Sequence, residues 1–256
     1  MAAIRFSLVL LFVLLAGCRQ DDEAMAARPE TACSERSFEG SRFTACRYDA
    51  AHDEIMIAVA DSNGPLRSFA RLKAALGPRA PRLLFAMNGG MFDAAGGPVG
   101  LYVQDGAEKH KINRRTGPGN FHMQPNGVFA VDGSGHVAIV PSPSWPPPRF
   151  QTRWATQSGP MLVIDGKLHP LIQSDGASRY IRNAVGVADP GTAWFVISDE
   201  PVSFGRLARF LRDGLRCRDA LYFDGAVSSL WDPAADRQDA REDLGPLVAV
   251  LRKPGR

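Results

Sequence analysis

The chain has few of the residues on which several common chemistries depend. Among 256 residues there are only five histidines and four cysteines, and the histidines are scattered without the spacing of metal ligands. The sequence also lacks a phosphate-binding loop ending in Gly-Lys-Ser/Thr and a Gly-x-Ser-x-Gly turn. These absences disfavour a zinc centre, nucleotide hydrolysis of the P-loop type and serine-esterase chemistry.

A strong excess of charge is absent as well. Thirty basic and 27 acidic side chains give a formal net charge of +3. A nucleic-acid surface needs clustered Lys and Arg, whereas the Arg-rich stretches at 114–115 and 206–218 are interrupted by acids and apolar residues. We therefore interpret both stretches as solvated faces and expect no nucleic-acid partner.

The chain is predicted to begin with an export signal. After Arg5, the apolar run 6–16 is shorter than the roughly 20 residues that span a bilayer as a helix. A basic start, an apolar middle and small residues before the cut are typical of a signal peptide. The run ends in Leu15-Ala16-Gly17-Cys18, which matches a bacterial lipobox, so Cys18 is predicted to carry the lipid.

This leader sets the predicted organisation of the chain. Residues 1–17 are the signal peptide, 18–30 a polar tether, and 31–256 the folded domain. Arg19, in place of the aspartate that retains lipoproteins in an inner membrane, favours the periplasmic face of the outer membrane. The alternative is an ordinary signal peptide that is cut near residues 24–27.

Two of the remaining cysteines are placed to form a bridge. Cys33 and Cys46 flank the turn Glu39-Gly40-Ser41 between two short predicted strands. In an oxidising compartment their disulfide would contribute roughly 3 kcal/mol in the chain-entropy model. Cys217, between apolar residues at a helix end, is predicted to be a buried and inert thiol.

The periodicity of the chain predicts an α+β fold. Helices are expected at 65–76, with Pro65 in the first turn, and at 203–215, with Ser203 as N-cap. Strands are expected at 54–60, 82–87, 99–104, 127–131, 136–140, 160–164, 184–188, 193–197, 220–223 and 246–251. One domain with a twisted, mostly antiparallel β-sheet, several hairpins and two main helices accounts for this pattern.

Three aspartates are interpreted as turn residues and excluded from the chemistry. Asp105-Gly106, Asp132-Gly133 and Asp165-Gly166 each lie between two extended segments, which is the hairpin signature. The proline-rich stretch 141–148 is expected to be a stiff surface excursion.

Other glycine turns are accompanied by polar side chains. Asn88-Gly89-Gly90 and Asp93 follow one apolar strand, and the segment 224–229 follows another. Glycine at a strand end lets the backbone approach a ligand and leaves amides free to donate. Similar segments at 120–127, 157–160 and 182–186 supply amides, hydroxyls and a guanidinium. Together they suit a polar, anionic sugar derivative.

These segments resemble, in their order along the chain, the phosphodiester glycosidase domain family over roughly residues 48–251. The segment Val99-Gly100-Leu101-Tyr102 is part of the same resemblance. The family includes the lysosomal uncovering enzyme, and this chain looks closest to the short bacterial lipoprotein members. The resemblance implies hydrolysis of a glycosyl phosphodiester without a cofactor. The sequence departs from the family's Asp-Gly-Gly-Gly-Ser at Ala226 and Val227.

The resemblance and the chemistry of glycoside cleavage assign candidate roles. Asp224 is the first candidate for nucleophile or base, with Asp199 and Asp93 as partner carboxylates, and Arg182 is expected to hold the phosphate bidentately. The expected substrate-binding residues are Asn88, Gly89, Gly90, Asn126, Gln157, Ser158 and Ser228.

Each assignment has a structural alternative. Arg182 could form an ion pair with Asp175 or Asp189, Asp224 could cap a turn, and Asp199 could cap the following helix.

Two functional alternatives also remain open. Asp93 and Asp224 could together hold a divalent cation, although no metal is predicted. A lipid-anchored, non-catalytic protein that binds envelope glycans would share the polar cleft without needing converging carboxylates. The natural sugar, the stereochemical outcome and the oligomeric state are not encoded in these motifs.

Overall fold

The computed structural model describes residues 31–62, 64–239 and 243–255. The predicted signal peptide, Cys18 and the tether lie outside these residues. Within them, no helix is long and apolar enough to cross a membrane.

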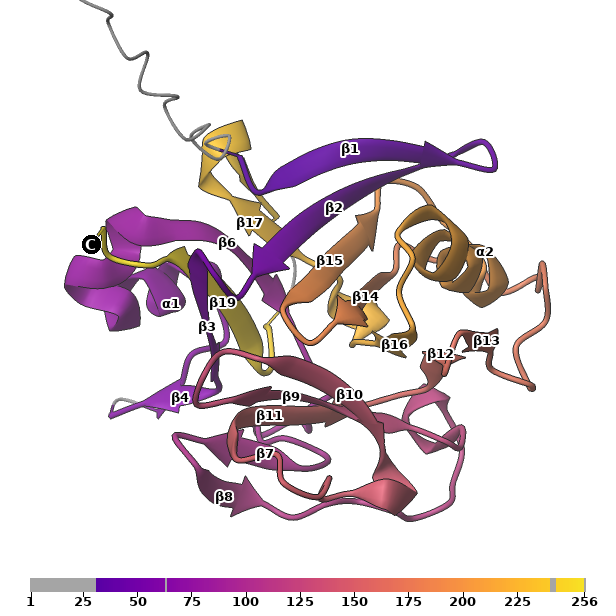
Figure 1. Cartoon of the computed structure of the whole chain (residues 1–256), viewed down its shortest axis with the longest axis horizontal. Coiled ribbons are helices and arrows are strands. Elements are labelled where there is room, and N and C mark those ends of the chain that lie inside the picture. Colours follow the sequence, from indigo (N-terminus) through magenta and orange to yellow (C-terminus); the bar gives the residue numbers. More distant parts are fainter. Residues whose placement is uncertain (1–30, 63, 240–242, 256) are drawn as a thin grey trace, which may run out of the picture.

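The described chain folds into three main antiparallel sheets (Figure 1). A seven-stranded sheet has the order β1-β2-β15-β14-β16-β12-β13, and two five-stranded sheets have the orders β10-β9-β11-β7-β8 and β18-β17-β6-β19-β3. The seven-stranded sheet consists of β1 (Cys33–Phe38), β2 (Ser41–Asp49), β12 (Met161–Ile164), β13 (Lys167–Leu168), β14 (Asn183–Asp189), β15 (Thr192–Ser198) and β16 (Asp219–Tyr222). The second sheet consists of β7 (Tyr102–Gln104), β8 (Ala107–His110), β9 (Gly127–Asp132), β10 (Val137–Pro141) and β11 (Thr152–Ser158). The third consists of β3 (Asp53–Ala58), β6 (Leu83–Asn88), β17 (Leu230–Asp232), β18 (Arg237–Gln238) and β19 (Leu247–Arg252), and β4 (Ala60–Asp61) pairs with β5 (Gly64–Pro65). The predicted mostly antiparallel α+β fold is confirmed.

Local turn chemistry explains the hairpins. Asp105 and Asp165 have φ angles of 48° and 52°, and the glycines after them have φ angles of 80° and 76°. Two successive left-handed residues match the twist of a two-residue hairpin turn. The Asp132 carboxylate instead accepts backbone N–H bonds from Ser134 and His136 in a longer turn. All three predicted turn aspartates therefore have that role.

Strand β11 was not predicted from the sequence, because its residues Thr-Arg-Trp-Ala-Thr-Gln-Ser are largely polar.

The three sheets pack around one central apolar cluster. Phe85, Phe129 and Phe195 come from one strand of each sheet, and their rings meet at centroid distances of 5.4 Å and 5.6 Å. This common core fixes the relative positions of the sheet ends, from which the functional residues project.

Each sheet has a second, outer cluster. Helix α2 (Phe204–Arg209) covers the seven-stranded sheet, and Ser203 caps it as predicted by accepting the Arg206 N–H. Helix α1 (Phe69–Leu76) covers the sheet that contains β6 (Figure 1). It begins four residues later than predicted, because Ser68 is the N-cap and Pro65 belongs to β5.

Two other segments differ from or refine the sequence prediction. The second helix continues after α2 as a π-helical turn, Phe210–Gly214. The proline-rich stretch 141–148 is not wholly a surface excursion, since Trp145 is only 9% exposed and packs on the outer cluster of the β9–β11 sheet.

The predicted Cys33–Cys46 bridge and the predicted burial of Cys217 are confirmed. Cys33 lies directly opposite Cys46 in the β1–β2 pair, and the two form a disulfide with a Cα–Cα distance of 3.8 Å. Cys217 is 2% exposed, and burial raises the pKa of its thiol to about 12. It therefore stays protonated and inert.

Candidate active site

A network of buried amides joins the ends of two sheets. Asn88 ends β6, Asn183 begins β14, and Ser228 and Ser229 precede β17. The Asn183 Nδ2 donates to both the backbone and side-chain oxygens of Asn88, at 2.9 Å each. The Asn88 Oδ1 also accepts the Ser229 N–H at 2.8 Å, and the Ser228 hydroxyl donates to Asn183 Oδ1 at 3.2 Å. These four residues fix the strand ends relative to one another.

The same network positions Asp224. Its backbone carbonyl accepts from Asn88 Nδ2 at 2.8 Å, and its N–H donates to the Gly89 carbonyl at 3.0 Å. The only donor that its carboxylate meets in the described chain is the Ala226 N–H, at 3.1 Å. Burial raises the pKa of Asp224, and the bond from Ala226 only partly opposes this. A half-buried carboxylate without a cation partner has features expected of a reactive group.

Arg182 is 1% exposed, and all the acceptors it finds in the described chain are neutral. Its Nε donates to the Val202 carbonyl at 2.9 Å, and its Nη1 donates to the Tyr222 hydroxyl at 3.1 Å. The Nη2 donates to the carbonyl and hydroxyl of Ser178, both at 3.1 Å. The guanidinium lies 3.7 Å from the ring centroid of Phe204.

The alternative ion pairs of Arg182 are not formed. Asp175 binds Arg179 and the Ser203 hydroxyl, and Asp189 accepts a backbone N–H within its own turn. A buried cation without a carboxylate partner is unusual, because transferring a charge out of water is costly.

Tyr222 connects this cation with Asp224. Burial raises the pKa of Tyr222, the neighbouring Arg182 charge lowers it, and the Asp224 carboxylate raises it. The charges of Arg182 and Asp224 therefore both act on the Tyr222 hydroxyl. They share a single buried environment.

Sequence reasoning missed Tyr222 and Asn183 as site residues. Tyr222 stands between Leu221 and Phe223, which belong to the central core, so it was interpreted as one more apolar strand residue. Strand alternation turns Tyr222 to the opposite face, where it packs edge-on to Phe204 at 4.7 Å. That alternation was the signal in the sequence that could have identified Tyr222 as a site residue.

Asn126 and Gln157 form a separate group. The Gln157 Oε1 accepts the N–H groups of Leu101 and Asn113 at 2.9 Å and 2.8 Å. Its Nε2 donates to the Asn113 carbonyl at 2.6 Å and to Asn126 Oδ1 at 3.2 Å. Because internal partners already occupy the amide of Gln157, these contacts favour a structural role over the predicted sugar binding.

Close backbone packing brings the segment after Asn88 against strand β11, which contains Gln157. A Cβ at Gly90 would lie 2.4 Å from both the Gln157 carbonyl and the Thr156 hydroxyl, so only glycine fits. Gly89 is less restricted, since its nearest atom would be 3.2 Å away. Ser158 is 0% exposed, and its hydroxyl has no partner within the described residues.

The two other predicted carboxylates are engaged elsewhere. Asp199 pairs with Arg237 at 3.1 Å and accepts the Thr44 hydroxyl at 3.1 Å. Asp93 is exposed and accepts two backbone N–H bonds of its own loop, both at 2.9 Å. Neither has a hydrogen bond to Asp224. The described chain also contains no group of three or more His, Cys, Asp or Glu residues that could hold a metal ion.

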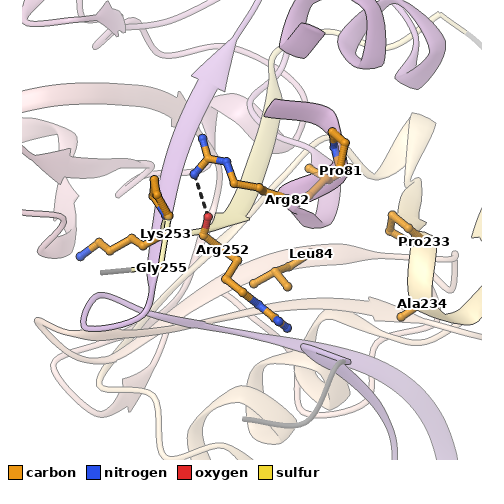
Figure 2. A pocket seen from close by; sticks show the side chains of 10 residues that line it. Pro81, Arg82, Leu84, Pro233, Ala234, Arg252, Lys253 and Gly255 are labelled. Carbon is orange, nitrogen blue, oxygen red and sulfur yellow. Dashed lines mark hydrogen bonds between the residues drawn. The ribbon is translucent and has the colours of Figure 1, made fainter. Parts of the chain in front are cut away.

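A cavity of about 510 Å³ at the C-terminal end contains none of the predicted site residues (Figure 2). Arg82 donates to the Arg252 carbonyl there at 2.9 Å and pairs with Glu54 at 3.0 Å. Figure 2 shows the Arg82 guanidinium turned toward that carbonyl. The cavity is therefore distinct from the surroundings of Asp224.

The model of the phosphodiester glycosidase family matches residues 82–241 of this chain, which is more than half of it. The chain belongs to the phosphodiester glycosidase family. The matched range contains the whole amide network together with Arg182, Tyr222 and Asp224, whereas the Cys33–Cys46 bridge lies outside it.

The chain is also similar to proteins of known sequence or structure. The uncharacterized protein YigE of Escherichia coli K12 is 38% identical over 168 residues, which are 66% of this chain and 65% of YigE. The match thus spans slightly less than two thirds of YigE. The catalytic domain of zebrafish N-acetylglucosamine-1-phosphodiester alpha-N-acetylglucosaminidase, auto-inhibited by its pro-peptide, superposes with a TM-score of 0.53 at 15% identity, over 87% of this chain and 82% of that one. A hypothetical protein from Synechocystis gives 0.52 at 13% identity, over 86% and 61%. At such identities the two structures show that the fold is shared.

Proposed function

We propose that this phosphodiester glycosidase-family protein hydrolyses a glycosyl phosphodiester at the anomeric carbon. One observation carries the proposal. Asp224, whose pKa burial raises, and Arg182, whose hydrogen-bond partners are all neutral, both act on Tyr222: Arg182 donates to its hydroxyl, and the Asp224 charge raises its pKa. The site therefore combines a carboxylate and a cation that do not neutralise each other. This combination suits a substrate with an electrophilic carbon beside an anionic leaving group, because the carboxylate can act on the carbon and the cation can stabilise the leaving group.

In the proposed reaction the Asp224 carboxylate attacks the anomeric carbon or removes a proton from an attacking water. The bond between that carbon and the phosphate oxygen breaks, and its electron pair stays on the phosphate. The products are the free sugar and a phosphomonoester, and the oxygen of water ends on the sugar. Because Asp224 must be ionised, activity is expected to rise with pH through its raised pKa.

The role of Arg182 differs from the bidentate phosphate grip expected from the sequence. Four of its five N–H groups already have acceptors, at Val202, Tyr222 and Ser178. We assign it as a positioning residue, whose charge polarises the Tyr222 hydroxyl. That hydroxyl accepts from Arg182 and keeps its own hydrogen for the departing phosphate oxygen. Asn88 contributes by fixing the Asp224 backbone.

The test is hydrolysis of a synthetic sugar-1-phosphate methyl diester in oxygen-18-labelled water. The label is expected in the released sugar, and activity should fall at least about a thousandfold in Asp224→Asn, as when a group acting in the transition state is removed. Asp213→Asn, in an exposed ion pair with Arg212, is the matched control and should retain activity. Label in the phosphate would mean phosphodiesterase chemistry and refute the proposal. Sugar binding without turnover in the wild type would favour the glycan-binding alternative.

We further propose that the protein acts in the bacterial cell envelope, anchored by lipid on Cys18 to the periplasmic face of the outer membrane. The Leu-Ala-Gly-Cys sequence supports this, and so does the Cys33–Cys46 disulfide, which is typical of an oxidising compartment. Cys18→Ser should abolish acyl labelling and detergent-phase partitioning. A wild-type product cut beyond Cys18 would contradict the anchor.

A further inference from the structure

A second cavity, of about 430 Å³, lies between the Asp93 loop and the segment 110–115. Its lining contains three cationic side chains, Lys111, Arg114 and Arg115, and a single carboxylate, Asp93. None of the three cations forms an ion pair within the described chain, and Asp93 is already engaged by two backbone N–H groups. The cavity therefore has an excess of positive charge.

This finding changes the interpretation of Arg114 and Arg115 as part of a solvated face. The Arg114 guanidinium is held in place, because its Nε donates to the Ser142 carbonyl at 3.0 Å and its Nη2 to the Trp145 carbonyl at 2.8 Å. Both acceptors are neutral, so its charge is not compensated. Arg115 and Lys111 are exposed and free to reach a ligand.

The backbone under these cations is also fixed. The buried Gln157 side chain accepts the Asn113 N–H and donates to the Asn113 carbonyl. The position of Asn113, and with it the start of the Arg114-Arg115 pair, is thus set from the protein interior. A preorganised site loses less entropy when it binds a ligand.

The segment from Gly89 to Val99, which contains Asp93, connects the cavity to Asp224. The Gly89 carbonyl accepts the Asp224 N–H, and Met91 then accepts the Val99 N–H at 3.0 Å. Val99 lines the cavity and accepts the Asn113 Nδ2 at 3.1 Å. Gly89, at one end of this segment, thus contacts the backbone of Asp224, and Val99, at the other end, lines the basic cavity.

We infer that this cavity binds a second phosphate of the substrate, so that the protein acts on glycans or polyol chains carrying consecutive phosphodiesters. The inference rests on the proposed function for the cleavage step. The binding site itself rests only on the uncompensated Lys111, Arg114 and Arg115. Arg and Lys donors recognise phosphate oxygens through charge-assisted hydrogen bonds.

Binding is tested without turnover, by titrating inorganic tripolyphosphate in a calorimeter. The double variant Lys111→Gln/Arg115→Gln should bind about tenfold more weakly than the wild type, with a smaller salt dependence. Arg36→Gln/Lys73→Gln removes two exposed cations outside the cavity and should bind like the wild type. Equal binding by all three proteins, or equal losses in both variants, would overturn the site.

Turnover separates this inference from the proposed function. The wild type should favour a substrate with two consecutive phosphodiesters over its single-phosphodiester counterpart by about tenfold in kcat/KM, and Lys111→Gln/Arg115→Gln should lose that preference. Hydrolysis of both substrates without preference, or an unchanged preference in the variant, overturns the second-phosphate site alone. Hydrolysis of neither substrate by the wild type overturns the proposed cleavage, and tripolyphosphate binding then decides the site.

Discussion

Tyr222→Phe removes one oxygen atom from the centre of the candidate site. Tyr222 is 2% exposed, and its ring packs edge-on to Phe204 with centroids 4.7 Å apart. Phenylalanine preserves that ring contact, so the substitution isolates the hydroxyl. The partner that loses its acceptor is Arg182 Nη1, at 3.1 Å.

The expected cost follows from the burial of Arg182. A hydrogen bond to a charged group contributes about 1.5–3 kcal/mol to stability. Because Arg182 is 1% exposed, water cannot replace the lost phenol oxygen. We therefore expect a loss of about 2 kcal/mol in the free energy of unfolding, or about 4–8 °C in Tm for a chain of this size.

The assay is urea unfolding followed by the fluorescence of the four tryptophans. The midpoint should fall with no change in the dependence on urea concentration. Tyr180→Phe is the matched control, since Tyr180 is 61% exposed and its hydroxyl has no hydrogen bond in the described chain. Its effect should stay below about 0.5 kcal/mol. Equal midpoints for Tyr222→Phe and Tyr180→Phe would refute the reasoning, because the buried bond to Arg182 would then carry no weight.

Three other variants test further features of the structure. Burial raises the pKa of Asp224 in the folded protein above its ordinary 3.8, so the stability of the wild type falls as pH rises through that raised pKa. Asp224→Asn should therefore be more stable than the wild type at neutral pH. The urea midpoints of the two proteins should converge in acid. Gly90→Ala should lower the unfolding free energy by about 2–4 kcal/mol in the same assay, because the new Cβ meets the Gln157 carbonyl. A neutral result would mean that the segment after β6 moves away from β11 at little cost. Cys33→Ala/Cys46→Ala should cost roughly 3 kcal/mol, equal to the effect of reducing the wild type, and an effect of reduction on the double variant would contradict a single bridge.

Local chemistry made much of the fold predictable. The turns at Asp105 and Asp165 need left-handed backbone, which Asp-Gly provides, and Ser203 needs only its own helix to act as a cap. The Cys33–Cys46 bridge joins neighbours on a single hairpin. Each feature depends on residues fewer than about 15 positions apart, so the sequence alone carries the information.

The grouping of the candidate site depends on pairing between distant strands. The sequence could nominate Asn88, Arg182, Asp224 and Ser228, and the structure does bring these four together. It could not separate them from Asp199, because Asp199 becomes the partner of Arg237 only once β15 and β18 are in place.

The functional weight of individual polar side chains was also decided by the tertiary structure. Gln157 looks like a ligand residue in the sequence, yet partners at Leu101, Asn113 and Asn126 occupy its amide. Tyr222 looks like a core residue, yet its hydroxyl is the contact between Arg182 and the surroundings of Asp224. The sequence alone determined the turns, the caps and the set of polar groups. Which of those groups keep unsatisfied charge depended on long-range packing, because burial and hydrogen-bond partners exist only after the three sheets meet.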